Sequence, residues 1–183
     1  MHRLWRSLGA AGPLRPGLLS RGWGAAGNRA VARWCEVETA APELAARVRE
    51  LLEAHRHKTI ATLRRDGAPR ISGTEAQFRD GDLWIGSMLG ARKAVDLQRD
   101  PRFALHSGSD DPPTWRGDAK VSGRMIEITD PARVAEINGP EVGPSHLFRA
   151  DIEEISTVRL NAGGDRLVVE SWREGGTTAR LER

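Results

Sequence analysis

Cysteine is almost missing from this chain of 183 residues, since Cys35 is the single one. One thiol excludes an internal disulfide and a zinc cluster built on cysteines, and it suits a reducing cytoplasm, where we expect the protein. No run of about 18 apolar residues occurs, so the sequence predicts no membrane-spanning helix and no membrane partner. The length suffices for one domain with a hydrophobic core and is marginal for two.

Acidic residues are absent from the first 35 positions, which hold six arginines. Because the whole chain carries +3, removing those six charges leaves −3 for residues 36–183. The basic character therefore belongs to the tail, and we do not expect nucleic acid as a partner. Residues 1–38 are rich in Gly, Ala, Arg and Pro and lack apolar periodicity, which predicts a disordered tail before a domain over residues 39–183.

Lysine is also rare, because only Lys58, Lys93 and Lys120 stand against 25 arginines. Together with the abundance of Ala and Gly, this bias indicates GC-rich coding. It favours a start site placed too far upstream as the origin of the basic tail. An organelle transit peptide is the alternative, since such peptides are rich in Arg and poor in acidic residues.

The spacing of apolar residues changes from helical to extended along the chain. Residues 42–55 carry an apolar stripe with helical period behind Pro42, which predicts an amphipathic helix. Strands joined by Asp-Gly and Gly-Gly turns then follow in meander order, which predicts a mostly β (α+β) domain with an antiparallel barrel or strongly curved sheet. We expect strands over residues 58–65, 69–79, 83–87, 102–107, 118–128, 145–160 and 166–173, and short helices over residues 91–100 and 130–137.

The segment GSMLGARKAVDLQRDPRF (residues 86–103) carries the strongest chemical signal. A strand ends at Gly86-Ser87 and a helix begins near Ala91, so that Arg92 and Lys93 lie in the first helical turn. Cations are poorly placed at the positive end of a helix unless an anion binds there. A phosphate monoester is the natural ligand, and the alternative is a solvated pair of cations on a helix face.

A second segment, PRISG (residues 69–73), places a glycine inside a strand. Gly73 indicates either a bulge that curves the sheet or a close approach of the backbone to a ligand. Arg70 offers a further cation for a phosphate, or it is simply exposed.

Together, PRISG, the strand that ends in Gly86-Ser87, and ARKAVDLQRDPRFAL (residues 91–105) resemble the pyridoxamine 5′-phosphate oxidase-like family of FMN-binding split barrels. The resemblance implies an antiparallel split β-barrel with short peripheral helices, and a homodimer that holds FMN at its interface and acts on a small-molecule substrate. It also implies a cofactor site with two groups of residues. Those that bind the phosphate are Arg70, Arg92 and Lys93. Those that line the flavin ring and ribityl chain are Ile71, Ser72, Gly73, Ser87 and Met88.

The C-terminus resembles the true oxidase only in part. Trp172 matches its tryptophan and residues 180–183 match its Arg-Leu-His-Asp-Arg run, but the histidine is missing and the run is one residue short. A glutamine of the family near the flavin is replaced at or near Asp118. We therefore do not expect oxidation of pyridoxamine phosphate itself.

Three hypotheses remain open on the sequence. The first is an FMN-dependent oxidoreductase that transfers a hydride to or from a small organic substrate. The second is a reductase of the same fold that uses a deazaflavin coenzyme, for whose more anionic tail Lys120 and Arg124 are candidates. The third is a non-catalytic flavin or haem binder.

Overall fold

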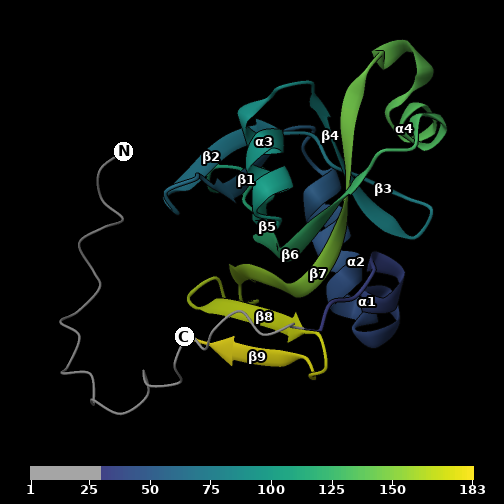
Figure 1. The fold of residues 1–183 in the computed structure, drawn as a ribbon. Coiled ribbons are helices and arrows are strands. Elements are labelled where there is room, and N and C mark those ends of the chain that lie inside the picture. Colours follow the sequence, from purple (N-terminus) through teal and green to yellow (C-terminus); the bar gives the residue numbers. More distant parts are fainter. Residues whose placement is uncertain (1–29) are drawn as a thin grey trace.

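The computed structural model describes residues 30–183 as one nine-stranded antiparallel sheet with short helices around it (Figure 1). The helices are α1 (Trp34–Ala40), α2 (Pro42–Glu53), α3 (Arg92–Arg99) and α4 (Pro131–Asn138), with a 3-10 turn η1 at Pro140–Val142. The strands are β1 (Lys58–Leu63), β2 (Pro69–Thr74), β3 (Gln77–Arg79), β4 (Asp82–Met88), β5 (Arg102–His106), β6 (Asp118–Ile128), β7 (Ser145–Leu160), β8 (Leu167–Arg173) and β9 (Ala179–Glu182). The mostly β fold class is confirmed.

The strands follow the order β2-β1-β5-β6-β7-β4-β3, and β8 and β9 extend the sheet from β7. Because β2 and β3 end this path without pairing to each other, the curved sheet stays open between them, as in a split barrel. Figure 1 shows β6 and β7 crossing the middle of the molecule, between β2-β1-β5 on one side and β4-β3 on the other.

Local sequence explains most of these elements. Pro42 begins α2, and the predicted stripe of Leu44, Val48 and Leu51 is buried against the sheet. The turn at Asp80-Gly81 has positive φ at both residues, which is the backbone of a tight hairpin turn.

Two predictions about strands are corrected by the sheet. Residues 69–79 do not form one strand, because β2 pairs with β1 whereas β3 pairs with β4, so the chain must leave one side of the open barrel for the other after Thr74. The short strand β9 was not predicted. Its backbone pairs only with β8 and its side chains are all exposed, so its sequence carries no apolar alternation.

A third correction concerns the N-terminal boundary, because the folded unit includes residues 30–38. The backbone of Ala32 exchanges two hydrogen bonds with Ile152, and Trp34 is fully buried in α1. The guanidinium of Arg33 donates to both carboxylate oxygens of the buried Asp82, at 2.9 and 2.5 Å. These contacts join residues far apart in the sequence, so the composition of the N-terminal segment alone could not predict them. The disorder predicted for residues 1–29 lies outside the described residues.

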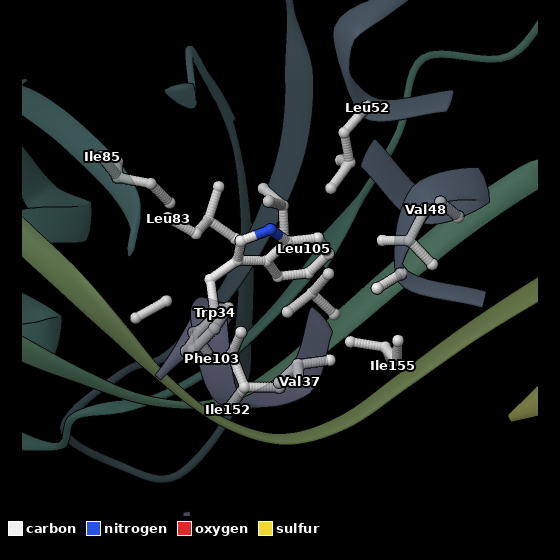
Figure 2. Packing of buried hydrophobic residues seen from close by; sticks show 14 of the residues in the cluster. Trp34, Val37, Val48, Leu52, Leu83, Ile85, Phe103, Leu105, Ile152 and Ile155 are labelled. Atoms are coloured by element: carbon white, nitrogen blue, oxygen red, sulfur yellow. The ribbon is translucent and has the colours of Figure 1, made fainter. Parts of the chain in front are cut away.

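The core lies inside the curve of the sheet, where α1 and α2 close it (Figure 2). The indole of Trp34 is at its centre, among side chains that include Leu83, Leu105 and Ile152. Its ring lies 4.5 Å from that of Phe78, measured between centroids. The short α1 therefore supplies one of the two tryptophan side chains buried in this core.

None of the helices found in residues 30–183 is long and apolar enough to cross a membrane. Within the same part of the chain, no group of three or more His, Cys, Asp or Glu side chains is placed to hold a metal ion.

The position of Trp34 predicts that Trp34→Ala lowers the free energy of unfolding by about 3–5 kcal/mol, because it leaves a large cavity in the core. Urea unfolding measures this loss. Val31→Ala is the control, because Val31 is 37% exposed. Equal, small effects of both substitutions would contradict the inclusion of residues 30–40 in the core.

Candidate functional site

A cavity of about 630 Å³, cavity 1, lies where the sheet is open. Its walls come from the start of β1, the ends of β2 and β4, the first turn of α3, and α4 with the loop that follows it. Segments far apart in the sequence thus meet at one place, and they include both chemical signals of the sequence, PRISG and the ARK turn.

Four of the eight predicted site residues line cavity 1, namely Gly73, Ser87, Met88 and Lys93. The Nζ atom of Lys93 donates a hydrogen bond to the carbonyl oxygen of Gly73 at 2.7 Å. The two signals are therefore in direct contact, with the ammonium group of α3 over the end of β2.

The backbone at Gly73 distinguishes between the two interpretations of this glycine. The pairing of β1 with β2 has no register shift, so Gly73 is not a bulge. A methyl group added at Gly73 would meet no atom within 4 Å, so there is free space beside the strand. The register shift is between β6 and β7 instead, where Glu153 is the extra residue opposite Ser122 and Gly123, and a side chain at Gly123 would meet the Asp151 carbonyl oxygen at 2.1 Å.

The first turn of α3 has the features of an anion site. Its N-cap residue, Ala91, offers no side-chain hydrogen bond to the free N–H groups of the turn. Arg92 is exposed and makes no hydrogen bond or ion pair with any described residue. Burial lowers the pKa of Lys93, and the nearby Glu75 opposes this shift only in part. An anion beside Lys93 would offset the cost of its partly desolvated charge.

Ser87 provides a further unsatisfied group. Only 9% of this residue is exposed, and its Oγ atom is buried without a hydrogen-bond partner among the described residues. Buried hydroxyl groups are normally bonded, so the orphaned Ser87 hydroxyl beside cavity 1 favours a polar ligand there. The exposed Met88, next in the chain, offers an apolar surface at the cavity mouth.

Arg70 lies away from cavity 1. Its Nε atom donates to Oδ2 of Asp96 in α3 at 2.6 Å, and the same oxygen accepts a bond from the hydroxyl of Thr62 at 3.0 Å. Arg99 approaches the other oxygen of Asp96 at 3.6 Å. Arg70 therefore ties α3 to β1 and β2 through a buried carboxylate.

The remaining predicted residues of β2 lie apart from cavity 1. The Ile71 side chain is 75% exposed on the outer face of the sheet, where it borders a second hollow of about 570 Å³, cavity 2, over β1, β5 and β6. Lys120 lines the same hollow, and Ser72 lines neither cavity.

The C-terminal residues do not approach cavity 1 of their own chain. Trp172 is 2% exposed within the core, and Arg180 lies 3.9 Å from Glu170 on the neighbouring strand. Asp118 accepts a hydrogen bond from the indole of Trp115 at 3.1 Å.

Sequence reasoning missed Lys58 and the wall formed by α4. Lys58 begins β1 and lines cavity 1 because the hairpin register pairs it with Thr74 at the end of β2. That register was available from the predicted hairpin. No local signal places Ile137 and Asn138 of α4 over β4, since that contact depends on the packing of α4 on β7.

The comparisons with known proteins agree with this geometry. A solved FMN-binding protein of Nostoc punctiforme, described as pyridoxamine 5′-phosphate oxidase-related, has 15% identity and a TM-score of 0.53 over 84% of this chain and 97% of its own. A putative pyridoxamine 5′-phosphate oxidase of Listeria innocua has 16% identity and a TM-score of 0.51 over 60% and 94%. At these identities the likeness shows the fold alone, which is that of the split barrels.

The family itself is shown by the sequence. The family model described as pyridoxamine 5′-phosphate oxidase matches residues 44–159, more than half of the chain. The chain therefore belongs to the pyridoxamine 5′-phosphate oxidase family, and the predicted resemblance is confirmed. A search of the curated proteins gives no match.

The Asp96 network predicts an acid-dependent loss of stability. Burial alone would raise the pKa of Asp96, but the bonds from Arg70 and Thr62 and the nearby charges outweigh it and lower the pKa. The stabilisation by the carboxylate is present above the unfolded-state pKa of about 4 and is lost as the pH falls through the folded-state pKa.

We expect Asp96→Asn to cost about 3–5 kcal/mol at pH 7, because it breaks a buried ion pair. The difference from the original chain should shrink as the pH falls below about 4. Urea unfolding at both pH values measures this, with Asp66→Asn in an exposed turn as the control. A difference that stays constant with pH would contradict an ionised Asp96.

Proposed function

We propose that this protein binds FMN in cavity 1 and acts as an oxidoreductase on a small organic substrate. The carrying observation is the contact between Lys93 and Gly73, which places an ammonium group beside the free N–H groups of α3 and the open space along β2. Membership of the pyridoxamine 5′-phosphate oxidase family and the fold shared with an FMN-binding protein support the proposal.

The residues of cavity 1 have distinct roles in this proposal. Lys93 and the first turn of α3 bind the phosphate, and Arg92 is free to turn toward it. The Ser87 hydroxyl hydrogen-bonds the ribityl chain or the ring edge. The edge of β2 that has no strand partner among the described residues offers backbone groups to the ring beside Gly73.

Bound FMN would supply hydride transfer, whereas the protein holds the reacting groups and excludes water. The walls of cavity 1 serve the second task, because Trp84 and Ile137 form an apolar surface between β4 and α4. The C-terminal run Arg-Leu-Glu-Arg lacks the histidine of the true oxidase, so the substrate is proposed to be other than pyridoxamine phosphate.

The predicted homodimer remains part of the proposal. The outer face of β2, β1, β5 and β6 carries cavity 2, and Ile71 projects beside it with 75% of its surface exposed. An apolar hollow beside an exposed isoleucine suits a self-complementary contact, in which the same face of a second copy covers it. Such a contact would place β2, and with it the cofactor site, next to the partner subunit.

Loss of the Lys93 charge tests the cofactor site. We expect Lys93→Met to weaken FMN binding by about 10- to 100-fold, the loss expected for one charge-assisted hydrogen bond. Fluorescence titration of free FMN measures the affinity. The control is Arg65→Met in the exposed β1–β2 turn, which should leave the affinity unchanged.

Gly73→Ala probes the same site without disturbing the fold, because the added methyl group meets no atom of the protein. It should weaken FMN binding and leave thermal stability unchanged. Unchanged FMN affinity in both Lys93→Met and Gly73→Ala would overturn the site. Uptake of a deazaflavin coenzyme but not of FMN would favour the second hypothesis.

The dimer predicts that Ile71→Asp halves the mass in solution, since it buries a charge in an apolar contact. Light scattering after gel filtration measures the mass. Val142→Asp is the matched control, since Val142 is also exposed but lies in η1, away from that face. A mass that is the same for Ile71→Asp and the original chain would contradict the proposed interface.

A further inference from the structure

The three lysines of this chain are not spread over its surface. Lys58 and Lys93 line cavity 1, and Lys120 lines cavity 2. The other 25 basic side chains are all arginines. An ammonium group is a compact charge with three donors, whereas a guanidinium is wide and planar, so the two are not interchangeable in a confined site. In a sequence with so strong an arginine bias, lysines confined to cavities point to a need for the smaller group.

Lys58 is held in place by the backbone alone. Its Nζ atom donates to the carbonyl oxygens of Arg56 at 3.1 Å and Ala76 at 3.4 Å. Two of its three protons are thereby engaged, and the third has no partner among residues 30–183. Only 6% of the residue is exposed, so the charge is largely withdrawn from water.

No carboxylate among the described residues forms an ion pair with Lys58. The nearest acidic residue in the wall, Glu75, is 2.9 Å from Arg56 and 3.9 Å from His57 instead. Burial lowers the pKa of Lys58, while Glu75 and Glu53 act in the opposite direction from a distance. With three cations (Arg56, Lys58 and Lys93) against Glu75, the described wall of cavity 1 has an excess of positive charge.

We propose that Lys58 forms a second anion subsite in cavity 1, which binds the carboxylate or phosphate group of the substrate. The inference rests on the proposed function, in which Lys93 holds the cofactor phosphate. Lys93 binds the carbonyl of Gly73 and Lys58 that of Ala76, three residues further along the chain. At about 3.3 Å per residue, about 10 Å of chain separates these two positions, and both lysines line cavity 1.

The rest of the wall indicates what the anion is attached to. Trp84, Ile137 and Val142 present apolar surface to the cavity in which Lys58 lies. A ligand that satisfies both features has a planar or aliphatic apolar body and one anionic group. The substrate class is therefore a small organic acid or phosphate ester, with its charged group at Lys58 and its apolar body along α4 and β4.

Calorimetric titration of the full chain tests this subsite with benzoate, phenyl phosphate and the neutral benzamide, each with and without FMN. Benzoate, phenyl phosphate or both should bind more tightly than benzamide. Lys58→Met should weaken that binding by about 10- to 100-fold, as expected for one charge-assisted bond, and change FMN affinity by less than about twofold. Arg65→Met is again the control and should change neither affinity.

The outcomes separate the two proposals. Failure to bind FMN, with benzoate or phenyl phosphate binding that depends on Lys58, would overturn the proposed function and leave the anion subsite. Anion binding equal in the original chain and Lys58→Met, or no preference over benzamide, would overturn the subsite alone. Whichever of benzoate and phenyl phosphate binds more tightly identifies the anionic group.

A second measurement covers the case in which Lys58→Met does not fold. Uniform ¹³C labelling leaves all three ammonium protons of each lysine in place, and lysine-to-arginine variants assign the Cε signals of the three lysines. Addition of benzoate or phenyl phosphate to the FMN-saturated protein should shift the Lys58 signal and leave that of Lys120 in place. A shift confined to Lys93 or Lys120 would overturn the subsite.

Discussion

The buried carboxylate of Asp96 is the interaction on which the candidate site depends. It joins α3 to both strands of the first hairpin, through Thr62 of β1 and Arg70 of β2. Because Asp96 fixes the position of α3, Lys93, which lies one turn earlier in the same helix, reaches the carbonyl of Gly73. A buried ion pair is weak evidence for stability as such, but it specifies one position of α3 among those that apolar packing alone would allow. The proposed anion site therefore depends on the ionic contact behind it.

Cavity 1 combines charge excess with partial burial, which is unfavourable in the absence of a ligand. Lys58 and Lys93 have lowered pKa values because burial disfavours their charged forms, and neither is within ion-pair distance of a described acid. The Ser87 hydroxyl, which borders the same cavity, has no described partner. Folding tolerates such costs at sites that bind ligands, because the ligand supplies the missing charge and hydrogen bonds.

Much of the fold could be predicted from the sequence, because its signals are local. The Asp-Gly turns, the stripe of α2 and the alternation in β6 and β7 each depend on neighbouring residues. The prediction of Gly73 and Lys93 as parts of one site came from family resemblance, and the structure does bring them together. The partner of Arg70 was not predictable in this way, since Asp96 is 26 positions away and is also within the segment assigned to the phosphate. The inclusion of Trp34 in the core was equally hidden, because its neighbours come from β4, β5 and β7.

The sequence by itself determined the class of the fold, the main turns, the family and the chemical types available to the site. The spacing of apolar residues, the turn residues and the charges are properties of short stretches of sequence, so they can be recognised without knowledge of the fold. Only the tertiary structure decided which cations are free and which are engaged: Arg70 is bound by a buried acid, whereas Lys58 and Lys93 face a common cavity. The physical reason is that the availability of a charge depends on what the folded chain places around it, and those neighbours come from distant parts of the sequence.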